Sequence, residues 1–201
     1  MVRTKKALAA AGRRFYARGW VMGTSGNFSV VRSRKPLRLI ISSSGVAKGE
    51  LTASSFLEVD AAGAAVGRTK LRPSAETLLH IVIANARGAG AVLHTHSIWS
   101  TLLSHRHLER GGLAIAGLEM LKGLDGVTTH EHSEWLPILP NSQDMTKLGS
   151  ELDRVLRMHP SAHGVLLAGH GLYTWGKNLA EAERHVEILE FLLEVEGRNS
   201  Q

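Results

Sequence analysis

Apolar residues recur along this chain with two spacings that alternate from segment to segment. In some segments they recur every three or four positions, as in an amphipathic helix, and in others they form short runs typical of strands. The expected helices are 4–18, 74–87, a segment that opens at Ser142 and ends before Pro160, and 179–196, with shorter helices near 97–103 and 116–122. The expected strands are 27–32, 37–45, 57–59, 90–96, 163–168 and 172–175.

Residues at the ends of these segments support the assignment. Ser74 is placed as the N-cap of its helix and Gly88 follows the last apolar residue of that helix, while Asn178 precedes the final helix. Helices and strands are interleaved, and neither a repeat nor a linker interrupts them. The pattern therefore predicts an α/β fold, with helices on both sides of a sheet, in a single domain over residues 1–201.

With 201 residues, 43% of them hydrophobic and 21% charged, the chain has the composition of an ordinary globular protein. It contains no cysteine, so disulfides, thiolate metal sites and a cysteine nucleophile are excluded. A transition metal would have to be held by imidazole and carboxylate groups. The N-terminal stretch is charged and no apolar run is long enough to span a membrane, so we expect a cytoplasmic protein without a membrane partner.

The chain is basic, with 24 Lys and Arg against 18 Asp and Glu and a net charge of +6. A basic cluster at 32–38 raises the question of nucleic-acid binding. Tyr and Phe are few, however, no nucleic-acid module is present and the other basic residues are dispersed. The charge therefore favours a small anionic substrate or simple solubility over nucleic acid.

Two histidines one residue apart end the apolar strand 90–96. Residues two apart in an extended strand point to the same side, so His94 and His96 direct two imidazoles at one point. Ligand sites of open α/β sheets also lie at the carboxyl ends of strands. This pair is the strongest candidate for half of a metal site.

The same spacing occurs twice more. His105 and His107 lie in a charged stretch expected to be a solvated loop or a helix end, where side chains two apart diverge. His130 and His132 are compatible with an extended segment, but the simpler interpretation is an exposed edge strand that is polar on both faces. The histidines without a partner at ligand spacing are expected to be structural or surface residues: His80, His159, His163 and His185.

A catalytic zinc ion takes three protein ligands and keeps one position open. The third candidate ligand is His170, which follows another apolar run within the sequence GHG. The flanking glycines allow an unusual backbone path and a close approach of substrate. Alone, His170 would be an ordinary turn residue, but together with His94 and His96 it predicts a three-histidine site.

Two short segments, GTSGN at 23–27 and SSSG at 42–45, are rich in glycine and serine. Backbone N–H groups in tight turns, with hydroxyls and an amide beside them, form a concavity suited to a phosphate, and Lys48 could add charge. Neither segment matches a nucleotide-binding pattern. Ordinary turns remain the alternative interpretation.

Two glutamates are candidates for proton transfer. Glu76 lies in the first turn of the helix 74–87, where the helix dipole also explains a carboxylate. Glu119 lies among apolar residues, and a pair with Lys122 would explain it equally well. A carboxylate desolvated beside a metal acts as a general acid or base, but the residues alone do not separate the two candidates.

In combination and in this order, GTSGN, SSSG, RPSAE, VLHTHS, EMLKG and AGHGLYTWG resemble the class II aldolase/adducin-head family over nearly the whole chain. The resemblance implies a three-layer α/β/α fold with a central, mainly antiparallel sheet, assembled as a homotetramer with sites near subunit interfaces. It implies one Zn²⁺ per subunit on His94, His96 and His170. The residues that it implies for the substrate phosphate are Asn27, Ser44, Gly45 and Ser74.

Within the family, GLEMLKGL and LPILPNSQDM are most similar to the dehydratases of methionine salvage, lyases that act on a methylthio ketose 1-phosphate. In those enzymes the proton-transfer role is assigned to the glutamate of the EM-KG motif, which is Glu119 here. Sugar-phosphate aldolases use the glutamate of the PSxE motif, which is Glu76 here and can approach the zinc. We expect Glu119 to be catalytic and Glu76 to lie near the substrate.

Two alternatives follow from the same resemblance. An aldolase or epimerase would bind a ketose phosphate at the same zinc site but break its C3–C4 bond. A non-enzymatic interaction module, as in adducin heads, would share the fold but lack the metal histidines. His94, His96 and His170 therefore favour an enzyme.

Overall fold

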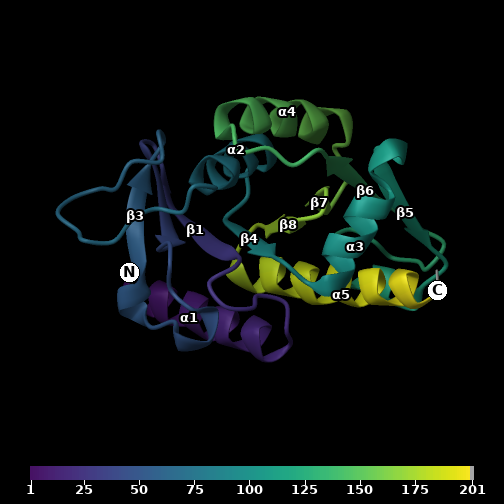
Figure 1. Cartoon of the computed structure of the whole chain (residues 1–201), viewed down its shortest axis with the longest axis horizontal. Coiled ribbons are helices and arrows are strands. Elements are labelled where there is room, and N and C mark those ends of the chain that lie inside the picture. Colours follow the sequence, from purple (N-terminus) through teal and green to yellow (C-terminus); the bar gives the residue numbers. More distant parts are fainter. Residues whose placement is uncertain (200–201) are drawn as a thin grey trace.

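The computed structural model describes residues 1–199 and contains one eight-stranded sheet with helices on both faces (Figure 1). The helices are α1 (Val2–Ala17), α2 (Thr77–Arg87), α3 (Ile98–Arg106), α4 (Met145–Met158) and α5 (Leu179–Asn199). The strands are β1 (Asn27–Arg34), β2 (Leu37–Ser42), β3 (Phe56–Asp60), β4 (Ala91–Thr95), β5 (Gly112–Ala116), β6 (Ser133–Leu139), β7 (Gly164–Leu167) and β8 (Gly171–Gly176). Short 3₁₀ turns include η1 (Lys48–Glu50) and η4 (Glu119–Gly123).

The strands are ordered β3-β2-β1-β4-β8-β7-β6-β5 across the sheet. Every neighbouring pair is antiparallel except β6 and β7, which run parallel. The prediction of an α/β fold with a central, mainly antiparallel sheet is confirmed. Because β4 and β8 lie side by side in the middle, the end of β4 meets the start of β8.

The two faces of the sheet belong to different cores. Helices α1 and α5 cover one face, and α2 and α4 cover the other (Figure 1). Successive residues of β4 alternate between them: Val92 packs with α2 and α4, whereas Leu93 packs with α1 and α5. By the same alternation His94 lies on the Val92 side, the side on which α2 begins. The two-residue period of a strand thus brings this histidine to the start of α2.

Two strands were missing from the sequence prediction. The segment 116–122 was expected to be a short helix, but β5 ends at Ala116 and only the 3₁₀ turn η4 follows. Strand β6 contains Pro137, which cannot donate to a strand ladder and argues against a central strand. It pairs nonetheless with β5 on one side and β7 on the other. The 130–132 segment, expected as an edge strand, is instead the turn before β6.

Two helix starts also differ from the prediction. Ser74 does not cap α2, because α2 begins at Thr77 and the Ser74 carbonyl accepts the Thr77 N–H in a preceding turn. Helix α4 begins after Asp144 rather than at Ser142, since the Asp144 carboxylate accepts the N–H groups of the first turn. Asn178 caps α5 as predicted, accepting the Glu181 N–H at 3.0 Å. Across residues 1–199, none of the helices has the length and apolar character needed to cross a membrane.

Candidate metal centre

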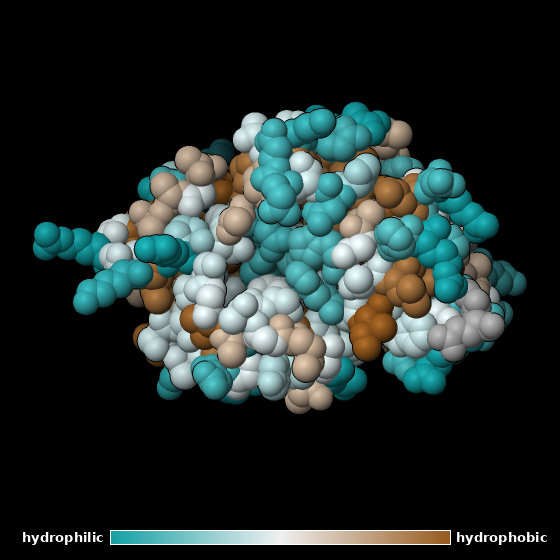
Figure 2. All heavy atoms as spheres, viewed as in Figure 1, coloured by the Kyte–Doolittle hydropathy of each residue, from teal (hydrophilic) through white to brown (hydrophobic). Residues whose placement is uncertain are grey.

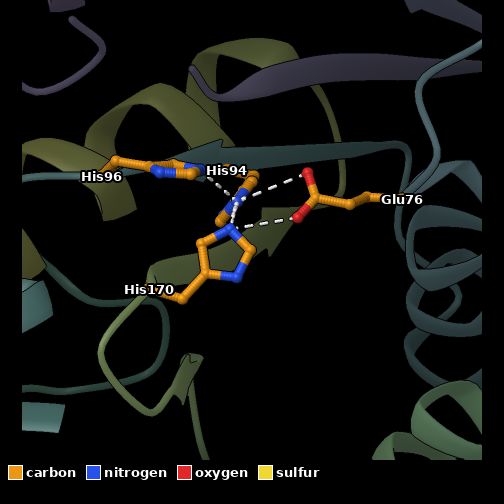
Figure 3. Close-up of side chains that lie close together, drawn as sticks. All are labelled: Glu76, His94, His96 and His170. Carbon is orange, nitrogen blue, oxygen red and sulfur yellow. Dashed lines mark hydrogen bonds and ion pairs between the residues drawn. The ribbon is translucent and has the colours of Figure 1, made fainter. Parts of the chain in front are cut away.

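Three histidines and one glutamate from separate parts of the chain meet where the central strands β4 and β8 end and begin (Figure 3). His94 and His96 come from the end of β4, His170 from the turn before β8, and Glu76 from the residue that precedes α2. One nitrogen or oxygen atom of each lies within 4.8 Å of the corresponding atoms of the others. The structure therefore brings together the three histidines singled out in the sequence, with Glu76 as a fourth member.

The Nε2 atom of His94 lies at the centre of the group. It is 2.7 Å from Nε2 of His96 and 3.3 Å from Nε2 of His170. The two oxygens of Glu76 face the group as well, with Oε1 3.1 Å from Nε2 of His170 and Oε2 3.6 Å from Nε2 of His94. Four donor atoms thus converge at separations that a single metal ion could bridge.

Backbone and side-chain contacts fix the imidazole rings. Nδ1 of His94 donates to the Leu172 carbonyl at 2.9 Å, so the lone pair of the neutral ring is on Nε2, which faces the cluster. Nδ1 of His170 lies 3.3 Å from Oδ1 of Asn141, and the His170 carbonyl accepts a hydrogen bond from the Thr101 hydroxyl at 3.0 Å. An imidazole that donates from its far nitrogen is held in the tautomer and orientation that metal ligation requires.

The glycines beside His170 are needed for this approach. Gly169 has φ +63, a left-handed conformation that favours glycine. A Cβ at Gly171 would lie 2.0 Å from the Thr95 carbonyl oxygen, so only glycine lets the turn press against β4. The GHG sequence therefore places His170 against the strand that carries the other two histidines.

Burial sets the charges in the cluster. It lowers the pKa of His96 to about 4 and that of fully buried His94 well below its usual value, so both rings are neutral at pH 7. Burial alone would raise the pKa of Glu76, but hydrogen bonds with His170 and Asn27 hold that pKa well below its usual range. Neutral imidazoles beside an ionised carboxylate form a donor set that attracts a cation.

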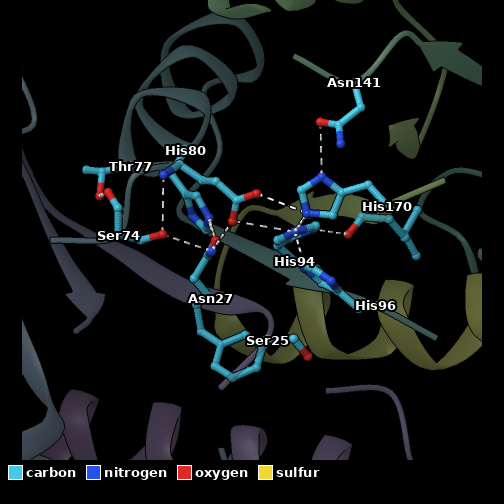
Figure 4. Close-up of polar contacts among 12 residues, drawn as sticks. Ser25, Asn27, Ser74, Thr77, His80, His94, His96, Asn141 and His170 are labelled. Atoms are coloured by element: carbon cyan, nitrogen blue, oxygen red, sulfur yellow. Dashed lines mark hydrogen bonds and ion pairs between the residues drawn. The ribbon is translucent and has the colours of Figure 1, made fainter. Parts of the chain in front are cut away.

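A chain of hydrogen bonds runs from the cluster into the core (Figure 4). Nδ2 of Asn27 donates to Oε2 of Glu76 at 2.6 Å, and Oδ1 of Asn27 accepts from Nε2 of His80. Nδ1 of His80 accepts from the Ser29 hydroxyl at 2.8 Å. Burial lowers the pKa of His80 to about 4, which keeps the ring neutral and fits this tautomer. His80, expected to be a structural or surface residue, is a buried structural residue with both ring nitrogens bonded, and it also orients Asn27 toward Glu76.

A polar pocket of about 200 Å³ opens beside Glu76 and His96. It contains all four residues expected to contact a substrate phosphate, and is lined by Thr24, Ser25, Gly26, Asn27, Ser43, Ser44, Gly45, Lys48, Ser74, Glu76 and His96. Figure 2 shows hydrophilic side chains gathered in a depression over β4 and β8, below α4. The two serine- and glycine-rich segments, 23–27 and 42–45, thus line one cavity.

Lys48 joins the 23–27 segment to Val46, the residue that follows the 42–45 segment. Its side chain is buried, and Nζ donates to the Thr24 carbonyl at 2.8 Å and the Val46 carbonyl at 3.0 Å. Burial lowers the pKa of Lys48 to about 8. The sequence indicated Lys48 only as a source of charge, whereas the structure shows that it also ties the loops together.

Glu119 lies outside the cluster of Glu76 and the three histidines. It is on η4 with 72% of its side chain exposed, and its carboxylate pairs with Lys122 at 2.7 Å and His130 at 3.8 Å. The contact with Lys122 matches the simpler interpretation of the sequence, and Glu119 is not desolvated within the chain. His105 and His107 lie at the C-terminal end of α3, as expected for a pair that does not converge on a metal.

The sheet and the histidine–glutamate cluster define an α/β protein with a site able to bind a metal ion. The sequence matches the Class II Aldolase and Adducin N-terminal domain over residues 6–196, and the chain belongs to this family.

Two groups of known proteins are similar to this chain. A protein named methylthioribulose-1-phosphate dehydratase from Methylococcus capsulatus is 44% identical over 192 residues, 95% of this chain and 91% of its own. One of the same name from Sorangium cellulosum is 42% identical over 180 residues, 89% of this chain and 84% of its own. Among solved structures, L-fuculose-1-phosphate aldolase from Thermus thermophilus has a TM-score of 0.74 at 26% identity, covering 96% of this chain and 93% of its own.

Proposed function

We propose that this chain is a zinc-dependent hydro-lyase that converts 5-methylthioribulose 1-phosphate to 5-methylthio-2,3-diketopentyl 1-phosphate, a step of methionine salvage. The convergence of His94, His96 and His170 beside a polar pocket of about 200 Å³ is the observation that carries the proposal. Dehydratases similar over most of the chain support this substrate class. The substrate carries a carbonyl, two reacting hydroxyl carbons and a phosphate. The histidine cluster would hold the metal that binds the ketose oxygens, and the polar pocket would bind the phosphate.

His94, His96 and His170 would hold the zinc, with Nε2 of each ring as the donor atom. Bound zinc supplies Lewis acidity toward the ketose oxygens, which acidifies the neighbouring C–H. Because His94 and His96 stay neutral through burial, protons do not compete for their lone pairs at pH 7. The ionised Glu76 balances the charge of the cation, and Asn27 keeps that carboxylate turned toward the histidines.

Asn27, Ser44, Gly45 and Ser74 would bind the substrate phosphate. The amide of Asn27 lies 3.2 Å from the Ser74 hydroxyl, and all four residues line the same pocket. The pocket borders His96 and Glu76, so a phosphate held there places the sugar carbons toward the histidines. The phosphate acts as a remote handle whose binding energy orients the reacting carbons.

We assign proton transfer to Glu119. The C3 proton is removed, the C4–O bond breaks with loss of water, and the resulting enol tautomerises to the 2,3-diketone. The hydrogen bond and charge of Lys122 hold the pKa of Glu119 below its usual value, so the carboxylate is ionised at pH 7. Its exposure in the single chain agrees with a site that is completed when subunits assemble.

The proposed assembly is a homotetramer with active sites near subunit interfaces. Helix α3, which begins two residues after His96, exposes 77% of Ile98 and 38% of Leu102. Exposed apolar surface next to a polar site is typical of a protein–protein interface. Assembly would cover these side chains and enclose the site beside them.

Glu76 supports a second candidate function, the aldolase. It contacts His94 and His170 directly, as expected for the acid/base of a retro-aldol reaction that breaks the C3–C4 bond. Phosphorus and proton NMR of zinc-loaded protein with 5-methylthioribulose 1-phosphate separates the two. Loss of the C3 and C4 carbinol protons with an intact carbon chain supports the dehydratase. Dihydroxyacetone phosphate would support the aldolase, and an unchanged substrate in zinc-loaded protein would contradict both for this substrate.

A further inference from the structure

A second cluster of histidine and glutamate lies at the opposite ends of the strands from the first. Glu134 is the second residue of β6, His132 precedes this strand, and His163 directly precedes β7. Because β6 and β7 run parallel, their starts lie side by side. The first cluster lies at the other ends of these strands, where β7 finishes and β8 begins.

The carboxylate of Glu134 sits between the two imidazoles. Its Oε2 lies 3.0 Å from Nε2 of His132 and 2.9 Å from Nδ1 of His163. Its Oε1 accepts the backbone N–H of His163 at 2.8 Å, which leaves Oε2 to face both rings. The side chain of Glu134 is 1% exposed, so this charge needs compensation from its neighbours.

The hydrogen bond made by Nε2 of His163 determines which ring nitrogen carries the proton. Nε2 donates to the Asp125 carbonyl at 2.8 Å, since a carbonyl only accepts. The neutral ring therefore has its lone pair on Nδ1, where it would meet the lone pairs of Glu134 Oε2. Two acceptors at 2.9 Å need a cation between them, either a proton or a metal ion. His94 in the first cluster has the same arrangement, with a carbonyl on one nitrogen and a glutamate oxygen near the other.

Both ring nitrogens of the neighbouring His185 already make hydrogen bonds, so neither is available as a metal ligand. Its Nδ1 donates to the Trp175 carbonyl at 2.7 Å and its Nε2 accepts the Asp125 N–H at 3.1 Å. The donor set is therefore two imidazoles and one carboxylate, a combination that binds zinc with a fourth position open. Zinc bond lengths place such donors about 3.3 Å apart, so the contacts of 2.9 and 3.0 Å need to widen only slightly.

A cavity of about 400 Å³ provides the open position. His132 and His163 line it together with charged residues of both signs: Arg87, Lys177, Asp125 and Glu181. We propose that His132, Glu134 and His163 bind a second divalent transition-metal ion, with zinc the best fit, whose fourth ligand is water or a small anion from this cavity. This site is separate from the one assigned to dehydration, and its metal needs no substrate.

Metal stoichiometry tests this inference in the full chain. Wild type, His132→Ala, His170→Ala and the double variant are equilibrated with excess Zn²⁺, freed of unbound metal and analysed for zinc per chain. The expected values are two, one, one and none. One zinc in the wild type, with no loss in His132→Ala, would overturn the proposal whether or not the protein is a dehydratase.

Two further measurements show whether His132→Ala is folded and where the second zinc ion binds. His132 is 28% exposed and outside the catalytic machinery, so dehydratase activity of His132→Ala should match the wild type, and a single cooperative thermal unfolding transition shows that the variant is folded. Anomalous diffraction at the zinc edge locates the second ion directly. A peak between His132, Glu134 and His163 supports the site, whereas a peak confined to the first cluster overturns it.

Discussion

His94 and Tyr173 are cross-strand partners in β4 and β8, and their rings stack with centroids 3.8 Å apart and planes inclined by 10°. The fully buried tyrosine thus covers one face of the ring at the centre of the histidine–glutamate cluster. Together with the Leu172 carbonyl, it leaves the imidazole a single orientation. Tyr173 belongs to the hydrophobic core, so core packing helps to fix the His94 ring of the candidate metal centre.

Removing the stacked ring should weaken metal binding. We expect Tyr173→Leu to lower zinc affinity by roughly tenfold, because His94 loses the surface that fixes its orientation. Tyr173→Phe keeps the ring and is the matched control, with affinity near that of the wild type. Competition with a chelating dye measures both, and equal affinities in the two variants would show that the ring does not position His94.

Loss of one histidine of the cluster should abolish both metal and turnover at the first site. We expect His170→Ala to lose one zinc equivalent and to reduce dehydration by at least about 10³-fold, since Lewis-acid stabilisation is worth several kcal/mol. His107→Ala, from a pair that does not converge, should keep the metal and the activity. Full activity of His170→Ala would remove this residue from the ligand set.

The two glutamates should differ when each is made neutral. Glu119→Gln is expected to keep the first-site zinc but lose turnover by about 10²–10⁴-fold, the usual contribution of a positioned acid or base. Glu109→Gln, another exposed glutamate, should change neither. Glu76→Gln should weaken metal binding, because a charge facing His94 and His170 is lost. Unchanged turnover in Glu119→Gln, with turnover lost in zinc-loaded Glu76→Gln, would move the proton-transfer role to Glu76.

Lys48 should contribute to stability and to substrate binding. Lys48→Met leaves the Thr24 and Val46 carbonyls without their donor, so we expect the free energy of unfolding to fall by about 1–3 kcal/mol. The KM should rise as well, because Thr24 lines the polar pocket proposed to bind the substrate phosphate. The exposed Lys70→Met is the control. Urea denaturation and steady-state kinetics measure the two effects, and a variant as stable as the control would refute the structural role.

Buried Glu190 should make the protein less stable as the pH rises. Burial raises the pKa of Glu190 to about 7, although the hydroxyl of Thr95, between His94 and His96, donates to it. The folded state then holds a proton that the unfolded chain releases near pH 4.5, so stability falls between about pH 4.5 and 7. Glu190→Gln should remove this loss and be more stable than the wild type at pH 8, by up to about 3 kcal/mol. Identical pH dependence of thermal unfolding in both proteins would contradict the shift.

Much of the fold could be predicted because its signals are local. The helical and strand periods depend on neighbouring residues, and a His-x-His pair on a strand converges wherever that strand packs. The His94 and His96 pair and the glycine-flanked His170 were therefore found from the sequence alone. The single domain over 1–201 and the roles of the site residues stay predictions.

The parts that escaped prediction depend on contacts between distant segments. Strand β6 was missed because Pro137 is unfavourable in isolation, and only β5 and β7 on either side justify it. His163 was expected to have no partner, yet the parallel pairing of β6 and β7 brings it to Glu134, 29 residues earlier in the chain. Spacing along the sequence carries no information about such a pair.

The order of the strands also governs when the first cluster can exist during synthesis. Strand β4 lies between β1 and β8, and β8 follows His170 in the chain. A ribosome that has released β1 to β4 has made His94 and His96, but not the strand that carries Tyr173 or the turn that carries His170. We therefore expect tight metal binding only after the C-terminal segments have emerged, and a nascent chain truncated before His170 should not retain zinc at this site.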